Sequence, residues 1–162
     1  MNHQHYNPDR FTRKSLRLPN RDYTAPGAYF VTIRSIPLDS LFEIPKLRSI
    51  LSDTWFALPK RYSFVKLDEF MIMPDHIHFI LWFDNTPTKR ETLGQVVGAY
   101  KSITTVHWMQ YLKSVGEDMK YPCHIWQEKF YDRVVRTNEL EQTRLYIRNN
   151  PLKLSQRPSP TP

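Results

Sequence analysis

Val65-Lys-Leu-Asp-Glu-Phe-Met-Ile-Met-Pro-Asp-His-Ile-His-Phe-Ile-Leu-Trp-Phe83 is the stretch that decides the fold of this chain. Its two ends, Val65 to Met73 and His76 to Phe83, are rich in β-branched and aromatic residues and predict two strands. Met73-Pro74-Asp75 predicts a tight turn between them. The whole stretch therefore predicts a β-hairpin.

Upstream of the hairpin, the sequence predicts one strand and one helix. Ala28 to Ile36 follows a Pro-Gly turn and has the composition of a strand. Ile44 to Tyr62 places its large apolar residues three and four apart, which is the period of a helix.

Downstream of the hairpin, the pattern changes twice more. Thr92 to about Leu112 has apolar residues at helical spacing, and Tyr131 to Arg136 is a short strand-like run. A last helix is expected from Asn138, which is spaced from Glu141 as in a capping box, and Pro151 is expected to stop it.

The resulting order is strand, helix, strand, strand, helix, strand, helix. This order predicts an α+β fold of the ferredoxin-like, split βαβ type: an antiparallel sheet with helices on one face and an appended C-terminal helix. We expect one domain at residues 21–154, preceded by a flexible basic arm at residues 1–20 and followed by a disordered proline-rich tail at residues 155–162.

Composition indicates the class of partner. The chain has 162 residues, with 23 Lys and Arg against 16 Asp and Glu, a formal charge of +7 that favours polyanions such as nucleic acid. The one cysteine, Cys123, cannot form an internal disulfide. The sequence shows no secretory signal and no apolar run long enough to span a bilayer, so we expect a cytoplasmic protein without membrane contact.

Two histidines lie at positions i and i+2 of the predicted strand at residues 76–83. Side chains alternate along a strand, so His76 and His78 point to the same face and can bind one metal ion through neutral ring nitrogens. Asp75 is placed to orient one of the rings. The alternative is that both are ordinary strand histidines that bond to backbone or water.

Tyr146 and Asn150 are four residues apart and therefore lie on one face of the last helix. An amide oxygen from Asn150 would complete a His-His-Asn set suited to Mg²⁺ or Mn²⁺, with Tyr146 one helical turn away. Taken singly, Tyr146 also fits a core aromatic residue, and the Asn-Asn-Pro sequence that ends at Pro151 also fits a simple helix end.

Five segments, in this order, resemble the REP-associated tyrosine transposases, a group within the single-tyrosine HUH transposases. The resemblance covers roughly Arg21 to Leu154. Its segments run from Asp22 to Ile33, Met73 to Phe79, Leu93 to Ser102, Trp126 to Arg136 and Tyr146 to Pro151.

The resemblance implies that His76 and His78 form the family's histidine–hydrophobic–histidine motif, that Tyr146 is the nucleophile, and that Asn150 assists in metal binding. It implies nicking and rejoining of single-stranded DNA at hairpin-forming, REP-like palindromes through a 5′-phosphotyrosine. The expected partner is single-stranded or hairpin DNA, and the expected assembly is a monomer or a homodimer.

Basic and aromatic residues are candidate DNA contacts. Trp126 and Tyr131 are candidates for stacking on an unpaired base, although both also fit buried aromatics. The candidate phosphate contacts, which also fit solvated surface charge, are Arg13, Lys14, Arg17, Lys101, Arg133, Arg136, Arg144 and Arg148.

Two other functions remain open at this point. The first is a non-catalytic nucleic-acid-binding protein or regulator on the same fold, since ferredoxin-like sheets also serve RNA recognition. The second is a metal-dependent hydrolase that uses a metal-bound water, for which the histidines matter and Tyr146 does not.

Overall fold

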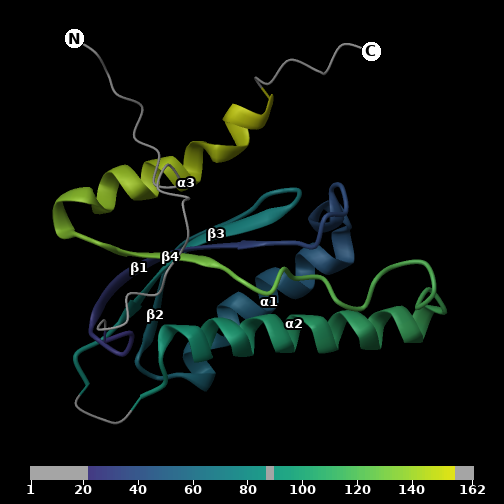
Figure 1. Ribbon diagram of the computed structural model, residues 1–162, viewed down its shortest axis with the longest axis horizontal. Coiled ribbons are helices and arrows are strands. Elements are labelled where there is room, and N and C mark those ends of the chain that lie inside the picture. The colour runs from purple at the N-terminus through teal and green to yellow at the C-terminus, as the bar shows by residue number, and fades with distance from the viewer. Residues whose placement is uncertain (1–21, 87–89, 156–162) are drawn as a thin grey trace.

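A four-stranded antiparallel sheet separates two layers of helix in the computed structural model, which describes residues 22–86 and 90–155 (Figure 1). The strands lie in the order β2-β3-β1-β4. Their bounds are Gly27–Arg34 for β1, Val65–Ile72 for β2, His76–Phe83 for β3 and Tyr131–Val135 for β4.

The helices lie on opposite faces of this sheet (Figure 1). Helix α1 (Pro45–Arg61) and helix α2 (Leu93–Val115) cover one face, and helix α3 (Leu140–Ser155) crosses the other. Short 3-10 turns, η2 (Leu41–Glu43) and η3 (Thr137–Glu139), precede α1 and α3. This is the predicted α+β fold, in which β2 and β3 form the predicted hairpin and α3 is the appended helix.

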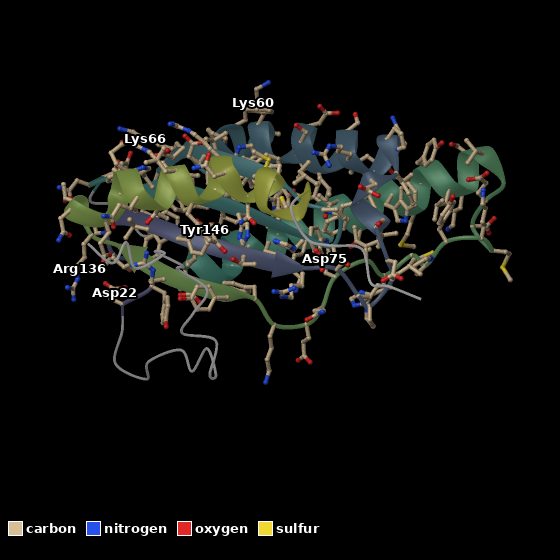
Figure 2. The ribbon with its side chains drawn as sticks, turned by 90° about the horizontal axis from the view of Figure 1, so that it is seen from above. Asp22, Lys60, Lys66, Asp75, Arg136 and Tyr146 are labelled. Carbon is tan, nitrogen blue, oxygen red and sulfur yellow. The ribbon has the colours of Figure 1, made fainter. Side chains whose placement is uncertain are left out.

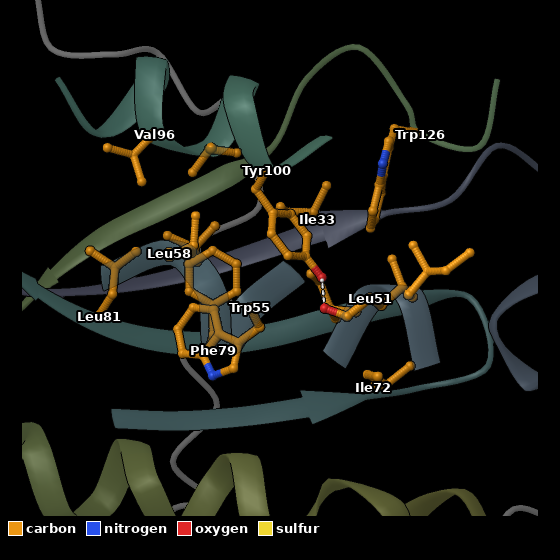
Figure 3. Close-up of a cluster of buried hydrophobic side chains, with 14 of the residues drawn as sticks. Ile33, Leu51, Trp55, Leu58, Ile72, Phe79, Leu81, Val96, Tyr100 and Trp126 are labelled. Carbon is orange, nitrogen blue, oxygen red and sulfur yellow. Dashed lines mark hydrogen bonds between the residues drawn. The ribbon is translucent and has the colours of Figure 1, made fainter. Parts of the chain in front are cut away.

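The main core fills the space between the sheet and the pair α1 and α2. Trp55 packs on Phe79 with ring centroids 4.8 Å apart, and the buried Tyr100 hydroxyl donates a hydrogen bond of 2.9 Å to the Leu51 carbonyl (Figure 3). Burial of such large aromatic side chains contributes about 2–3 kcal/mol each. This face of the sheet therefore packs against helices and stabilises the fold.

Helix α2 has strong signals at both ends. Thr92 and Gln95 form a reciprocal capping box, with the Thr92 N–H donating to Gln95 Oε1 at 2.8 Å. Gly116 ends the helix in the left-handed conformation, at φ 70°. These caps extend the helix to Val115, three residues beyond the predicted end.

The start of the last helix differs from the prediction. Asn138 lies inside the 3-10 turn and does not cap α3, which begins at Leu140. Glu139 holds this turn instead, because its carboxylate pairs with Arg133 and accepts the backbone N–H of Arg136. The predicted Asn138–Glu141 box is therefore wrong.

The predicted stop at Pro151 is also wrong, since α3 continues through this residue to Ser155. A proline inside a helix removes one backbone hydrogen bond, but this cost falls here in the last turns of the helix. The predicted domain boundary at residue 154 falls within this last turn. The arm at residues 1–20 and the tail after Ser155 lie outside the described residues.

Edge strand β2 contains a β-bulge. Leu67 lies opposite Leu81 and Phe70 opposite Phe79, so three steps along β2 match two steps along β3. The bulge therefore contains Asp68 and Glu69, where a regular strand would have one residue. Both are oriented toward α3, whose arginines they bind.

Candidate active site

His76 and His78 lie on the sheet face that α3 covers, away from the main core. Strand alternation sends Ile77 and Phe79 into the core beneath α1 and α2 and leaves the two histidines on the other side. His78 is buried and lies opposite Thr32 of β1, while His76 is half-buried. The predicted same-face arrangement of the histidines is confirmed.

The two imidazole rings converge through one nitrogen each. The distance between His76 Nε2 and His78 Nε2 is 3.1 Å. His76 Nδ1 lies 2.5 Å from Asp75 Oδ1, and His78 Nδ1 lies 2.8 Å from Thr32 Oγ1. When each Nδ1 carries the proton and donates it to its oxygen, both Nε2 atoms present lone pairs to the same point.

This separation fits two ligands of a single ion. Two nitrogens that each lie about 2.1 Å from a metal are about 3.0 Å apart at a 90° angle and about 3.4 Å apart at a tetrahedral angle. Burial, followed by the charges of His76 and Arg34, lowers the pKa of His78 to about 3. His78 is therefore the neutral imidazole that metal binding requires.

Helix α3 brings Tyr146 onto the same face. Ile147 is fully buried against Phe30 and Ile80 of the sheet and anchors the helix there. The Tyr146 ring lies 5.6 Å from the His78 ring, at an angle of 64°, and 6.3 Å from the Phe30 ring. Figure 2, seen from the α3 side, shows Tyr146 over the sheet.

The direction of α3 determines where Asn150 lies. Arg144 shares a carboxylate with Trp82, near the end of β3, whereas Tyr146 lies against His78, nearer the start of that strand. The helix therefore runs opposite to β3. One further turn, about 6 Å, carries Asn150 toward the start of β3.

The Asn150 side chain fits the role of a third ligand. Its Nδ2 atom is buried and has no hydrogen-bond partner among the described residues. Rotation of the amide by 180° exchanges Nδ2 with Oδ1, so the same site can present an oxygen. Within the described residues, no group of three His, Cys, Asp or Glu side chains is placed to hold a metal, so a metal bound at His76 and His78 would take its third protein ligand from another residue type.

Four of the predicted DNA-contacting cations are already engaged within the protein. Lys101 donates from Nζ to the carbonyls of Gln127 and Glu128 at 2.7 Å and 2.9 Å. The other three pair with carboxylates: Arg133 with Glu139, Arg144 with Asp68 and Glu141, and Arg148 with Glu69.

The remaining predicted cations fall into two groups. The Arg136 side chain is exposed, points away from the body of the protein in Figure 2, and makes no ion pair within the described part of the chain. Arg13, Lys14 and Arg17 lie outside the described residues. DNA contact by all of these residues remains a prediction.

Of the two aromatic residues predicted to stack on a base, Trp126 is excluded. It is completely buried, and its indole N–H donates to Thr104 Oγ1 at 3.0 Å. Tyr131 is half-buried on the face that α3 covers, 6.2 Å from the Phe30 ring. Trp126 is therefore a core residue.

Thr32, Asp68 and Glu69 belong to the surroundings of the site and were not predicted. Thr32 faces His78 because of the pairing register between β1 and β3, which local patterns do not specify. The role of the two acidic residues depends on the bulge in β2.

Within the described residues, none of the helices has the length and apolar character needed to cross a bilayer.

The chain is similar to known proteins in sequence and in fold. The chain is 26% identical to an uncharacterized protein of Haemophilus influenzae, over 91% of this chain and 92% of that one. Its fold resembles that of a REP-associated tyrosine transposase bound to a REP hairpin, with a TM-score of 0.62, 18% identity, and coverage of 85% of this chain and 74% of the other.

A second structural relative is a candidate transposase from Deinococcus radiodurans, with a TM-score of 0.54, 16% identity, and coverage of 80% of this chain and 94% of that one. The family model described as "Transposase IS200 like" matches residues 54–150, a segment that contains both histidines, Tyr146 and Asn150. The chain therefore belongs to the IS200-like transposase family.

Proposed function

We propose that this protein nicks and rejoins single-stranded DNA at hairpin-forming, REP-like sequences through a covalent bond to Tyr146. The observation that carries the proposal is the meeting, within one chain, of the Tyr146 ring and the convergent Nε2 atoms of His76 and His78. The hairpin-bound relative of similar fold supports hairpin DNA as the substrate.

Tyrosine is a weak nucleophile at neutral pH, because the ordinary pKa of a phenol is about 10. The site therefore needs positive charge at the phosphate that Tyr146 attacks. His76 and His78, with the Asn150 amide oxygen, would hold a divalent cation, Mg²⁺ or Mn²⁺, which supplies that charge when bound.

The remaining steps belong to the side chains of this protein. Tyr146 Oη forms a bond to phosphorus, and the bond from phosphorus to the 3′-oxygen of the preceding nucleotide breaks. The phenolic proton leaves Oη and a proton reaches the departing oxygen, so the step takes up no net proton and releases none. The products are a 5′-phosphotyrosine and a free 3′-hydroxyl.

Rejoining follows the same path in reverse. A 3′-hydroxyl attacks the phosphotyrosine, its oxygen forms the new phosphodiester, and Tyr146 Oη departs and regains a proton. One phosphate ester replaces another in each step, so no nucleotide cofactor is required. Asp75 and Thr32 keep the two imidazoles in the tautomer and orientation that the reaction needs.

The experiment uses a pool of hairpin oligonucleotides with randomised single-stranded flanks, labelled at the 3′ end. In the presence of Mg²⁺ or Mn²⁺, wild-type protein should convert label into a species that migrates with the protein under denaturing conditions. Tyr146→Phe should bind the hairpins and form no such species. Tyr111→Phe, a half-buried tyrosine of α2, is the matched control and should behave as wild type.

The same experiment separates the alternatives. Cleavage that persists in Tyr146→Phe but requires His76 and His78 would indicate a hydrolase with a metal-bound water. Binding without cleavage, in every metal tested, would indicate a non-catalytic DNA-binding protein.

A further inference from the structure

Helix α3 is attached to the sheet by ion pairs as well as by apolar contacts. Ile147 is the fully buried apolar side chain among residues 140–151 of this helix. Leu140 and Tyr146 pack beside it but are only partly buried, and the buried Thr143 is polar. Apolar packing of this kind resists separation of the helix from the sheet but does little to stop the helix from sliding or rotating. The precision with which Tyr146 meets His78 therefore requires further contacts.

Asp68 and Glu69, which we call the acidic pair, supply those contacts from β2. In a regular strand, consecutive side chains point to opposite faces of the sheet. The bulge between Leu67 and Phe70 breaks this alternation, and both acidic residues reach the α3 side. Without the bulge, one of the two would turn away from α3.

The contact at Asp68 is bidentate and largely shielded from water. Arg144 donates from Nε to Oδ1 at 2.9 Å and from Nη2 to Oδ2 at 2.6 Å, and Trp82 donates its indole N–H to Oδ2 at 2.8 Å. The Asp68 side chain is only 9% exposed. Three donors hold this carboxylate in place, and its two hydrogen bonds with Arg144 therefore fix the position of the guanidinium group.

The contact at Glu69 lies one helical turn further along α3. Arg148 donates from Nε to Glu69 Oε1 at 2.8 Å, with a second bond from Nη2 to the same oxygen. The Arg148 side chain is half exposed, so this pair is weaker than the first. Together the two pairs hold α3 at positions on either side of Tyr146.

We propose that the acidic pair positions the nucleophile: Asp68 and Glu69 set the rotation and the axial placement of α3, and through it the distance from Tyr146 to the histidines. This inference rests on the proposed function. It also assigns Arg144 and Arg148 to ion pairs within the protein rather than to DNA phosphates. A displacement of about 1 Å at a reacting group can cost about 100-fold in rate.

A charge-swap experiment tests the assignment. Glu69→Arg places two cations side by side, and we expect it to lower the single-turnover rate of adduct formation about 10-fold or more at saturating hairpin. Glu69→Arg combined with Arg148→Glu restores an ion pair with the wild-type net charge and should recover most of the rate. If Arg148 instead binds a phosphate, the swapped protein would stay defective and bind hairpin more weakly.

Asp68→Asn is the second variant, since it keeps the shape of the side chain and removes its charge. We expect a reduced adduct rate with a hairpin Kd within about threefold of wild type. Glu117→Arg, which disrupts the remote pair with Lys120 in the loop after α2, is the matched control and should leave the rate unchanged. A wild-type rate in both Asp68→Asn and Glu69→Arg would overturn the proposal.

Hydrogen exchange of the DNA-free protein tests positioning independently of chemistry. Asp68→Asn should speed exchange of the α3 amides and shift the Trp82 indole N–H resonance, while α1 and α2 keep their protection. If wild-type protein forms no adduct, the proposed function fails, but hydrogen exchange still tests whether the acidic pair holds α3 in place. Unchanged α3 exchange in both acidic-pair variants would refute it.

Discussion

Replacing Thr32 by valine tests how the buried histidine is held. The two side chains are nearly equal in volume, but valine leaves His78 Nδ1 without the oxygen that lies 2.8 Å away. Thr32 is 4% exposed and His78 is 1% exposed, so water cannot replace the lost partner without rearrangement. A buried polar group left unsatisfied costs about 1–3 kcal/mol.

Two results are expected from Thr32→Val. The free energy of unfolding should fall by about 1–3 kcal/mol, and each kcal/mol corresponds to about 2–4 °C in Tm for a chain of this size. Affinity for Mn²⁺ should fall about 10- to 100-fold, because the His78 ring loses the bond that fixes its tautomer and orientation. Urea unfolding measures the first quantity, and calorimetric titration with Mn²⁺ measures the second.

Thr104→Val is the matched control. Thr104 is also fully buried and accepts the Trp126 indole N–H at 3.0 Å, but it lies in the main core. It should lose similar stability and keep its affinity for Mn²⁺. If both variants bind Mn²⁺ as wild type does, Thr32 contributes only to folding and the reasoning about ring orientation is refuted.

Three further predictions concern stability and are measured by urea unfolding. Ile147→Ala should cost about 2–4 kcal/mol because this buried side chain anchors α3, whereas the half-exposed Leu145→Ala should stay within about 0.5 kcal/mol; equal effects would contradict the assigned face of α3. In EDTA, acidification from pH 6.5 toward 4 should destabilise wild type more than His78→Asn, because the pKa of His78 is about 3 in the fold and about 6.5 in the unfolded chain, so the unfolded chain takes up the proton first. The free energy of unfolding should change by at most about 1.4 kcal/mol per pH unit from this group. If the free energy of unfolding has the same pH dependence in both proteins, a buried neutral His78 is excluded. Gly116→Ala should cost about 1 kcal/mol because φ is 70° at this position, whereas Gly98→Ala, inside α2 with open space around the added carbon, should stabilise by about 0.5–1 kcal/mol. Stabilisation by Gly116→Ala would refute the cap assignment.

The parts of the fold that depend on local patterns were predictable from the sequence. Alternation along residues 76–83 places His76 and His78 on one face, and helical spacing places Tyr146 and Asn150 on one side of a helix. The element order follows from similar periodicities. Ligand chemistry led to the expectation that these two sets of residues meet, and the resemblance to the transposase family added their roles in the reaction.

The parts that depend on contacts distant in the sequence were not predictable. The bulge at Asp68 and Glu69 exists only in the pairing of β2 with β3, so nothing in the local sequence distinguishes Arg144 and Arg148 from solvated cations. Similarly, the aromatic ring of Trp126 is of a type that stacks on bases, and only the tertiary packing shows that it is buried in the core.

The bulge in β2 also affects how the sheet meets other chains. An edge strand with a regular row of unpaired N–H and C=O groups is a template on which a strand of another molecule can add. β2 is an edge strand, and its bulge interrupts that row at the point where two ionised side chains are already bound to α3. The device that aims two carboxylates at one helix therefore also discourages edge-to-edge aggregation along this side of the sheet.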